Sequence, residues 1–259
     1  MLPNAVPLTS AEALILSVSD LNDRDRIVVF VTREQGKKKG VAKGSRARHS
    51  RFSGQLQPLG KAAITWFEKE GAELVRLSSV ELIRPAGKLL EELDDILLGA
   101  YLAEHLIEFA QEDEPSEALY RLLDATLEAL LAGADRDAVA RYFEAWVLRL
   151  GGIFPAPREC PECGGDLGIK GAVLPRGGDG LICAECAGRE GRPGLALLPG
   201  AVEFLLRIGR VPPALAADPP PAPAVLRQVE ALCAEVRRGF LQHELKSRLV
   251  LEQIRGGAR

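Results

Sequence analysis

The segment Arg24–Arg51, RDRIVVFVTREQGKKKGVAKGSRARHSR, combines a short apolar run with a dense cluster of positive charge. It holds ten Lys and Arg against two acidic residues, a local net charge of +8 in a chain of 259 residues whose formal net charge is -3. The rest of the chain must therefore sum to -11. Positive charge gathered in one segment of an acidic protein indicates a polyanionic partner.

The same segment predicts two strands and a loop. Ile27–Val31 is a β-branched and aromatic run typical of a buried strand, and Gly36 marks the turn after it. A second strand is expected around Gly40–Lys43, and Gly44–Arg51 is expected to be a mobile loop. Basic side chains then lie on strand edges, a turn and a loop, where a nucleic-acid backbone can lie across them. The alternative is a solvated charged loop, and the uneven charge favours nucleic acid.

Three further strands are expected on either side of this segment. Glu12–Ser19 precedes it, and Ala62–Phe67 and Ala72–Leu77 follow it as a hairpin joined through Gly71. Five short strands in about 80 residues fit a small closed barrel, and the OB-fold is the five-stranded barrel that commonly binds oligonucleotides. An SH3-like barrel fits the pattern almost as well.

Beyond Pro85 the hydrophobic period becomes helical. Amphipathic helices are expected over residues 89–110, 116–132 and 136–150, with Asp135 as the cap of the third, then over 201–208 and 224–254. Six prolines between Val211 and Pro223 predict a stiff connector without regular structure. The chain is thus predicted to be an α+β multidomain protein, with an OB-fold barrel at 1–84, a helical bundle domain at 85–157 and 198–259, and an inserted ribbon at 158–197.

The inserted ribbon carries two Cys-x-x-Cys pairs. Cys160 and Cys163 are separated by 19 residues from Cys183 and Cys186, which matches the zinc-ribbon template of two knuckles around one tetrahedral ion. Four thiolates close the coordination shell, so the predicted Zn²⁺ is structural. Cys233 lies on an apolar helix face and is expected to be a core residue.

Several classes of protein are disfavoured by what the sequence lacks. No apolar run is long enough for a membrane helix, and Met1–Asn4 lacks the charged start of a leader, so a cytoplasmic protein is expected. There is no phosphate-binding Gly-Lys-Ser/Thr loop, no Gly-x-Ser-x-Gly elbow and no His-Glu-x-x-His. With three histidines in the chain, a binding function is favoured over an enzymatic one.

The N-terminal motifs resemble those of the bacterial DNA repair protein RecO family. The resemblance rests on EALIL at 12–16, DRIV at 25–28, TREQGK at 32–37, GVAKG at 40–44, SRF at 50–52 and LQP at 56–58. It extends to the whole order of barrel, helices, four-cysteine ribbon and terminal helices, and the cysteines place the chain in the zinc-bearing branch.

This resemblance implies a recombination mediator. Proteins of the family bind single- and double-stranded DNA, anneal complementary strands without ATP, bind the acidic tail of the single-stranded DNA-binding protein, and work with RecR to load RecA. The triple lysine Lys37–Lys39 departs from the family pattern by making the turn more basic.

Annealing requires two polyanions to be brought together while their base edges stay free. Aromatic residues are scarce, and of Phe30, Phe52, Trp66 and Phe67 near the basic segment we expect Phe30 and Phe67 to be needed in the core. Contacts to phosphates, with little base stacking, are therefore predicted. The residues predicted to make them are Arg33, Lys37, Lys38, Lys39, Lys43, Arg46, Arg48 and Arg51.

Three other functions stay open on the residues alone. One is an RNA-binding module built from barrel and ribbon. Another is a scaffold whose basic loop docks an acidic protein partner. The most distant is a metal-dependent nuclease, for which no paired acidic cluster stands near the basic segment.

Overall fold

The computed structural model describes residues 8–69, 71–178 and 180–257, which form two compact units. The first unit is Met1–Asp124 with Leu245–Arg259, and the second is Ala125–Glu244. The limits predicted at residues 84, 157 and 197 remain a prediction. Met1–Asn4, which bear on the expected absence of a leader, lie outside the described residues. Nowhere in the described ranges is a helix both long and apolar enough to cross a membrane.

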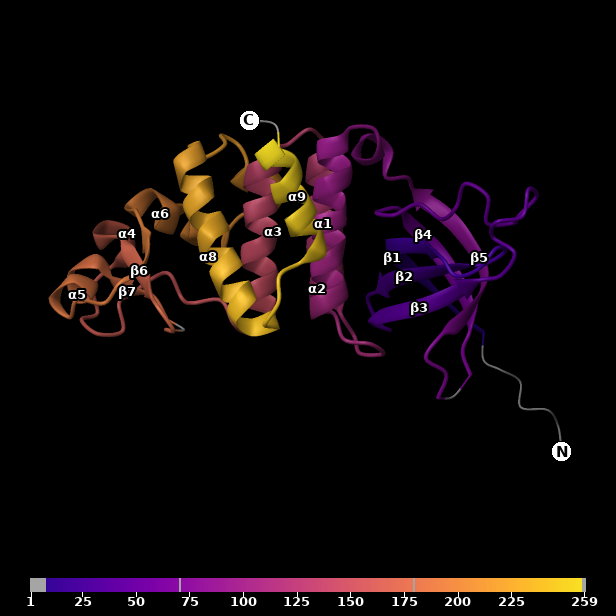
Figure 1. Cartoon of the computed structure of the whole chain (residues 1–259), viewed down its shortest axis with the longest axis horizontal. Helices are drawn as coiled ribbons and strands as arrows, with labels where there is room; N and C mark the ends of the chain where they lie inside the picture. Colours follow the sequence, from indigo (N-terminus) through magenta and orange to yellow (C-terminus); the bar gives the residue numbers. More distant parts are fainter. Residues whose placement is uncertain (1–7, 70, 179, 258–259) are drawn as a thin grey trace. The chain divides into compact units, whose positions relative to one another are not determined.

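The first unit begins with the predicted five-stranded barrel (Figure 1). The strands close in the order β1-β2-β3-β5-β4, and β4 pairs back onto β1. The β3–β5 pairing is parallel and all the other pairings are antiparallel. This Greek-key order is that of the OB-fold and separates it from a simple meander. The strands are β1 (Leu8–Asp20), β2 (Arg26–Thr32), β3 (Lys37–Ala42), β4 (Lys61–Phe67) and β5 (Val75–Arg84).

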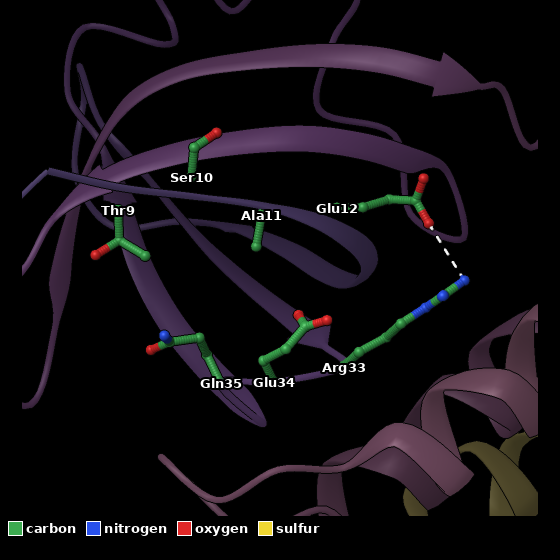
Figure 2. Close-up of a pocket in the computed structure, with 7 residues that line it drawn as sticks. All are labelled: Thr9, Ser10, Ala11, Glu12, Arg33, Glu34 and Gln35. Atoms are coloured by element: carbon green, nitrogen blue, oxygen red, sulfur yellow. Dashed lines mark ion pairs between the residues drawn. The ribbon is translucent and has the colours of Figure 1, made fainter.

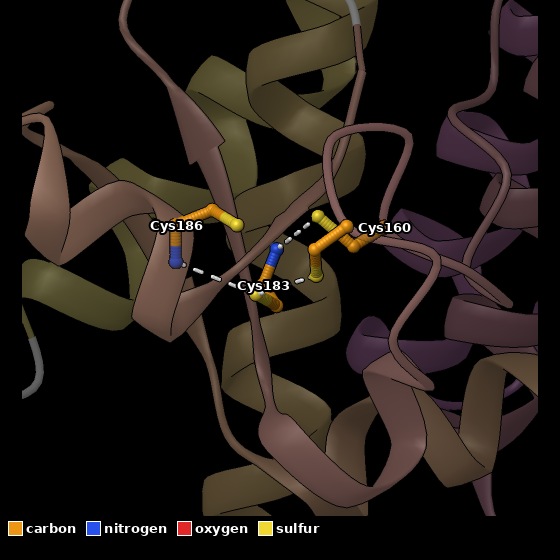
Figure 3. Close-up of side chains that lie close together, drawn as sticks. Cys160, Cys183 and Cys186 are labelled. Atoms are coloured by element: carbon orange, nitrogen blue, oxygen red, sulfur yellow. Dashed lines mark hydrogen bonds between the residues drawn. The ribbon is translucent and has the colours of Figure 1, made fainter.

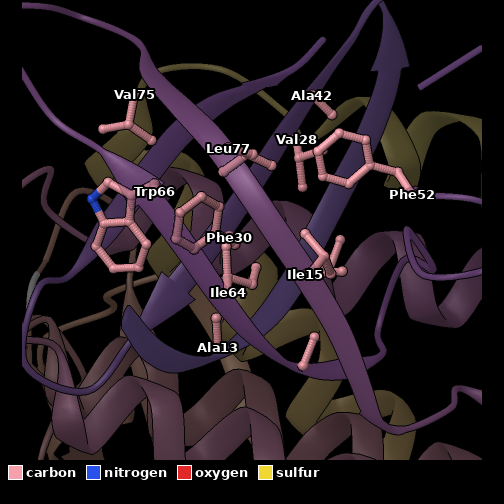
Figure 4. Packing of buried hydrophobic residues seen from close by; sticks show 12 residues of the cluster. Ala13, Ile15, Val28, Phe30, Ala42, Phe52, Ile64, Trp66, Val75 and Leu77 are labelled. Carbon is pink, nitrogen blue, oxygen red and sulfur yellow. The ribbon is translucent and has the colours of Figure 1, made fainter. Parts of the chain in front are cut away.

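Inward-facing side chains from every strand fill the barrel (Figure 4). Phe30 and Trp66 pack edge to face with ring centroids 5.4 Å apart, and both are fully buried. We expected Phe67 in this core, and that was wrong. Successive residues on a strand face opposite sides, so the inward Trp66 forces Phe67 outward, where 38% of it is exposed.

The segment between β3 and β4 is a chain of tight turns, and its expected mobility remains a prediction. Successive backbone N–H groups donate to the carbonyl three residues earlier: Ser45 to Ala42, Ala47 to Gly44 and Ser50 to Ala47. Phe52 follows these turns and packs in the barrel core, where the residue is 2% exposed. The basic side chains of this segment are therefore presented from an ordered backbone.

Helices complete the first unit. The predicted helix over residues 89–110 is divided into a 3-10 turn, η1 (Gly87–Leu90), and α1 (Leu93–Phe109). α9 (Lys246–Gly257) packs on α1, where the Glu104 carboxylate accepts hydrogen bonds from the backbone N–H groups of Lys246 and Ser247. α2 (Glu117–Leu131) starts in this unit, and the division at Asp124 falls within it.

The second unit contains helices and a small three-stranded sheet ordered β7-β6-β8. Asp135 caps its first helix as predicted, accepting a hydrogen bond from the Ala138 N–H at 2.8 Å. The proline-rich segment does contain regular structure, the one-turn helix α7, because Pro is tolerated in the first turn of a helix. Cys233 is fully buried on α8, as expected. The elements are α3 (Arg136–Leu150), α4 (Leu167–Lys170), β6 (Ala172–Pro175), β7 (Ile182–Cys183), α5 (Ala184–Arg189), β8 (Gly194–Leu197), α6 (Pro199–Arg207), α7 (Pro213–Ala216) and α8 (Pro223–Leu241).

Candidate nucleic-acid interface and metal centre

The three consecutive lysines of β3 are held by the last turn of α1 and by the acidic connection that follows it, residues 107–114 together. The Lys37 ammonium donates a hydrogen bond to the Ile107 carbonyl at 2.6 Å. The Lys39 ammonium lies 2.7 Å from a Glu112 carboxylate oxygen. Backbone pairing reinforces these contacts, because the Lys37 N–H bonds to the Gln111 carbonyl. Lys38 and Lys39 are thus paired with carboxylates of their own unit, while Lys37 is held by a backbone carbonyl.

Lys38 is the most deeply placed of the three. It points into the barrel with 5% of its side chain exposed, and its ammonium lies 2.6 Å from Glu68 and 2.5 Å from Asp113. Burial lowers the pKa of Lys38, but the hydrogen bonds to Asp113 and Glu68 outweigh burial and leave it above its ordinary value. A phosphate contact by Lys38 would require both ion pairs to break.

The turns after β3 present a second group of cations, which we call the basic loop (residues 43–51). Lys43, Arg48 and Arg51 are exposed, and within the ranges the structure describes they form no ion pair. Arg51 stacks over the Phe52 ring at 4.9 Å. Arg46 is partly engaged, since it donates to the Asn22 carbonyl at 2.8 Å and lies 3.4 Å from Asp20.

The backbone of the basic loop is tied to the β1–β2 turn. The Gly44 N–H donates to the Asp25 carboxylate at 2.8 Å, and the Arg46 N–H donates to the Arg24 carbonyl. The hydrogen bond from Gly44 is the main cause of a lowered pKa of Asp25. These contacts fix where the loop leaves β3, and so they fix the direction in which its cations point.

Arg33, at the end of β2, belongs to a separate polar site (Figure 2). Its guanidinium lies 3.7 Å from the Glu12 carboxylate and 5.0 Å above the Tyr120 ring. Tyr120 also donates to Glu12 at 2.8 Å, and Lys61 bridges Glu12 to Asp124. The pocket beside Arg33 has a volume of about 590 Å³ and is lined by Thr9, Ser10, Ala11, Glu12, Arg33, Glu34 and Gln35. Arg33 therefore connects the barrel to α2.

The four ribbon cysteines converge in the second unit, and Figure 3 shows Cys160, Cys183 and Cys186 of this cluster. Cys160 and Cys163 lie on a turn closed by the Gly164 N–H bonding back to the Cys160 carbonyl, while Cys183 ends β7 and Cys186 lies in α5. All four sulfur atoms lie within 4.8 Å of one another. The Cys163 and Cys183 sulfurs are 3.7 Å apart. A tetrahedral ion with metal–sulfur bonds of about 2.3 Å sets its sulfurs about 3.8 Å apart, so the residues fit a bound metal.

The surroundings shift the pKa values of two cysteines in opposite directions. Burial and hydrogen bonds with Cys183 and Cys163 raise the pKa of Cys186 to about 12. Burial opposes ionisation of Cys160, but backbone N–H groups of Cys183, Glu162 and Cys163 outweigh it and lower the pKa of Cys160 to about 6. Arg189 donates to the Cys186 sulfur at 2.8 Å. Such donors to sulfur orient metal-binding thiolates and offset their charge. The cluster can therefore hold one metal ion.

Comparison with known proteins identifies the family of this chain. The family model described as "Recombination protein O N terminal" matches residues 7–86, and "Recombination protein O C terminal" matches residues 90–249. The chain belongs to the Recombination protein O (RecO) family. Neither matching model describes an enzyme family, and DNA repair and recombination is the role of RecO proteins.

Individual relatives match over most of their length. The DNA repair protein RecO of Anaeromyxobacter sp. (strain K) is 36% identical over 242 residues, 93% of each chain. That of Geobacter metallireducens is 31% identical over 250 residues, covering 95% of this chain and 98% of the relative. That of Symbiobacterium thermophilum is 31% identical over 210 residues, covering 78% and 79%. The resemblance seen in the N-terminal motifs is thus confirmed for both halves of the RecO chain.

The barrel also carries a group of exposed side chains that was not predicted from the sequence. Phe67 at the end of β4 is the Cα partner of Arg76 on β5, and Lys69 and Leu74 lie on the connection between these strands. Together these four side chains line a cavity of about 400 Å³. Strand alternation was the signal that could have found it, since only one of Trp66 and Phe67 can face the core.

Proposed function

We propose that this RecO protein is a recombination mediator that binds single- and double-stranded DNA, anneals complementary strands without ATP, and helps RecR to load RecA. The acidic tail of the single-stranded DNA-binding protein is a further partner. We place this activity in the cytoplasm, on DNA of the nucleoid.

The observation that carries the proposal is the basic loop. Within a family of recombination proteins, it presents Lys43, Arg48 and Arg51 from ordered turns with their charges uncommitted to any carboxylate of the described residues. Contacts to phosphates dominate the affinity of most nucleic-acid-binding proteins and release condensed counterions. A cation that is already paired must first lose its partner, which lowers its net contribution.

The eight predicted DNA-binding residues therefore divide into two groups. We propose that Lys43, Arg46, Arg48 and Arg51 make the first phosphate contacts. Arg33, Lys37, Lys38 and Lys39 contribute their field but hold structural contacts of their own. Cations brought between two strands lower the repulsion between their phosphates, and phosphate contacts leave the base edges free to pair.

We propose Zn²⁺ as the ion of the cysteine cluster. A four-thiolate tetrahedral donor set is typical of structural zinc. Bound there, the ion cross-links the two Cys-x-x-Cys segments and has no open position for catalysis. The cluster then stabilises the ribbon and takes no part in chemistry on DNA.

The deciding experiment is annealing of two complementary labelled oligonucleotides, followed by energy transfer in the absence of ATP. The native protein should accelerate annealing, and a K43A/R48A/R51A variant should lose most of the acceleration. The salt dependence of binding gives a second readout. Loss of three single-strand phosphate contacts should reduce the slope of log K against log salt by about 2.

A charge-matched control separates the basic loop from net charge. The K88A/R121A/R210A variant also loses three exposed cations, none of them on the basic loop, and should anneal like the native protein. Equal loss in both variants would refute a localised surface. No acceleration by the native protein, with preferred binding of RNA or of an acidic peptide, would favour an RNA-binding module or a scaffold for an acidic partner instead.

A further inference from the structure

An exposed row of side chains crosses all five strands on the outside of the barrel. Pairing of Cα atoms runs from Leu8 to Phe67, from Phe67 to Arg76, from Arg76 to Val41 and from Val41 to Ile27. Phe67, Arg76, Val41 and Ile27 each have a buried neighbour on their strand, so these four face outward, and Leu8 is itself 59% exposed. Four of the five are apolar, which is unusual for a solvated face of a strand.

Exposure is high at Leu8 and Phe67, and at Leu74 beside them, whereas Ile27 and Val41 are half-buried. Leu8 is 59% exposed, Leu74 is 39% exposed and Phe67 is 38% exposed. Phe67, Leu74, Lys69 and Arg76 line the cavity of about 400 Å³ described above. This volume lies within the range of about 300–1,000 Å³ that is common for small-molecule sites.

The connection between β4 and β5 carries Glu68, Lys69, Glu70 and Glu73, so the charge at this cavity depends on which side chains line it. Two of its four described lining residues are cations and none is acidic. Lys69 and Arg76 form no ion pair within residues 8–69, 71–178 and 180–257, unlike Lys38 and Lys39 of β3. The Glu68 carboxylate, adjacent in sequence, is already committed to Lys38 at 2.6 Å and to the Trp66 N–H at 3.1 Å.

We propose that this cavity is a base-stacking subsite for single-stranded DNA, in which one base stacks on Phe67 and the adjoining phosphates contact Lys69 and Arg76. The inference rests on the proposed function and names how the single strand is held. An aromatic ring beside unpaired cations is the combination that single-strand binders use. A purely apolar peptide would leave both cations without a partner, so charge complementarity favours the nucleic acid.

The subsite is compatible with annealing. A base uses its face to stack, and its pairing edge lies in the plane of the ring, so a base on Phe67 can still meet a complementary strand. Duplex DNA has its bases stacked on one another, so it cannot use the subsite. Phe67 should therefore favour single strands, whereas the basic loop serves both forms of DNA.

The test compares three ligands of equal length by fluorescence anisotropy at fixed salt: an oligothymidylate, the same backbone without bases, and a duplex. The F67L variant keeps an apolar side chain at an exposed position, so the fold should be retained. We expect F67L to bind oligothymidylate roughly 5- to 150-fold more weakly, the effect of losing one base–aromatic stack. Binding of the base-free strand and of duplex should be unchanged.

Further variants sharpen the result. F67W should bind oligothymidylate at least as well as the native protein, because tryptophan offers a larger stacking face. R76A should weaken oligothymidylate and the base-free strand alike, since both carry phosphates. F240L, which alters an exposed phenylalanine on α8 outside the barrel, serves as the matched control and should change nothing.

The proposal is overturned if F67L binds oligothymidylate as the native protein does, or if the native protein does not distinguish oligothymidylate from the base-free strand. The first of these outcomes would assign the exposed row to a protein partner. Failure of the native protein to bind any DNA is a different result, because it refutes the proposed function itself.

Discussion

Lys38 offers a sharp test of the reasoning about charge in β3. The K38M substitution keeps an unbranched side chain of similar length inside the barrel and removes the ammonium group. It leaves Glu68 and Asp113 without the cation that lies 2.6 Å and 2.5 Å from them. The structure predicts that this change destabilises the first unit, although a run of three lysines in a sequence suggests a solvated surface.

The magnitude follows from the burial of the partners. Breaking a fully buried pair costs about 3–5 kcal/mol, and a surface pair is worth about 0–1 kcal/mol. The Lys38 side chain is 5% exposed, but Asp113 is 69% exposed and can regain water, while Glu68 is 30% exposed. We therefore expect the free energy of unfolding to fall by about 2 kcal/mol.

Urea denaturation followed by tryptophan fluorescence measures this loss. The chain has two tryptophans, so a W146F background leaves Trp66 in the barrel core as the reporter. With an m-value of about 1–2 kcal/mol per molar urea, the midpoint should fall by roughly 1–2 M.

The neighbouring lysine supplies the control. Lys39 pairs with Glu112, but the two side chains are 43% and 49% exposed, so K39M should cost less than about 1 kcal/mol. Equal midpoints for K38M and K39M would refute the argument that burial decides the role of each lysine in this run.

Three further predictions follow from other contacts. C160S should lose its bound metal and become protease-sensitive over residues 158–197, while C233A keeps one ion per chain by metal analysis; retention of metal by C160S would contradict the site. Burial raises the pKa of Glu12, but hydrogen bonds from Tyr120 and Lys61 outweigh burial and leave this pKa below 4.5. The free energy of unfolding should therefore fall as the pH drops below 4.5, and E12Q should make it depend less on pH. Parallel pH profiles of the native protein and E12Q would refute this role. G36A should lower the stability in thermal melts more than G44A does, by roughly 1 kcal/mol or more. Both glycines have positive φ, but only at Gly36 would a Cβ clash with a backbone oxygen, that of Glu114; equal losses would contradict the clash.

Local pattern was enough to predict most of the architecture. The five strands, the change to helical periodicity after Pro85 and the convergence of four cysteines all follow from spacing within short windows. β5 runs on to Arg84, beyond the predicted Leu77, because Ser78–Ser79 interrupts the apolar pattern without ending the pairing to β4.

The roles of individual cations were harder to predict because they depend on distant residues. Lys38 is separated from Asp113 by 75 positions, and no local rule connects a lysine run to an acidic connection between two helices. Strand alternation could have predicted that Lys38 points inward, since Ala42 and Gly40 face inward and Lys38 lies two residues before Gly40. The eight basic residues were all predicted to contact phosphates because their charge was considered without the side of the strand on which each one lies.

The polar contacts around Tyr120 and Asp124 limit how far the barrel can be separated from the rest of the chain. A fragment ending at residue 84 would keep Lys61 and Arg84 but lose the Asp124 carboxylate, which lies 2.8 Å from each. It would also lose Glu112 and Asp113, the counter-ions of Lys39 and Lys38. Such a fragment would carry a large uncompensated positive charge and would bind polyanions for reasons that the intact protein does not share. A fragment that keeps the counter-ions of the barrel must therefore extend through the acidic connection and the first turns of α2.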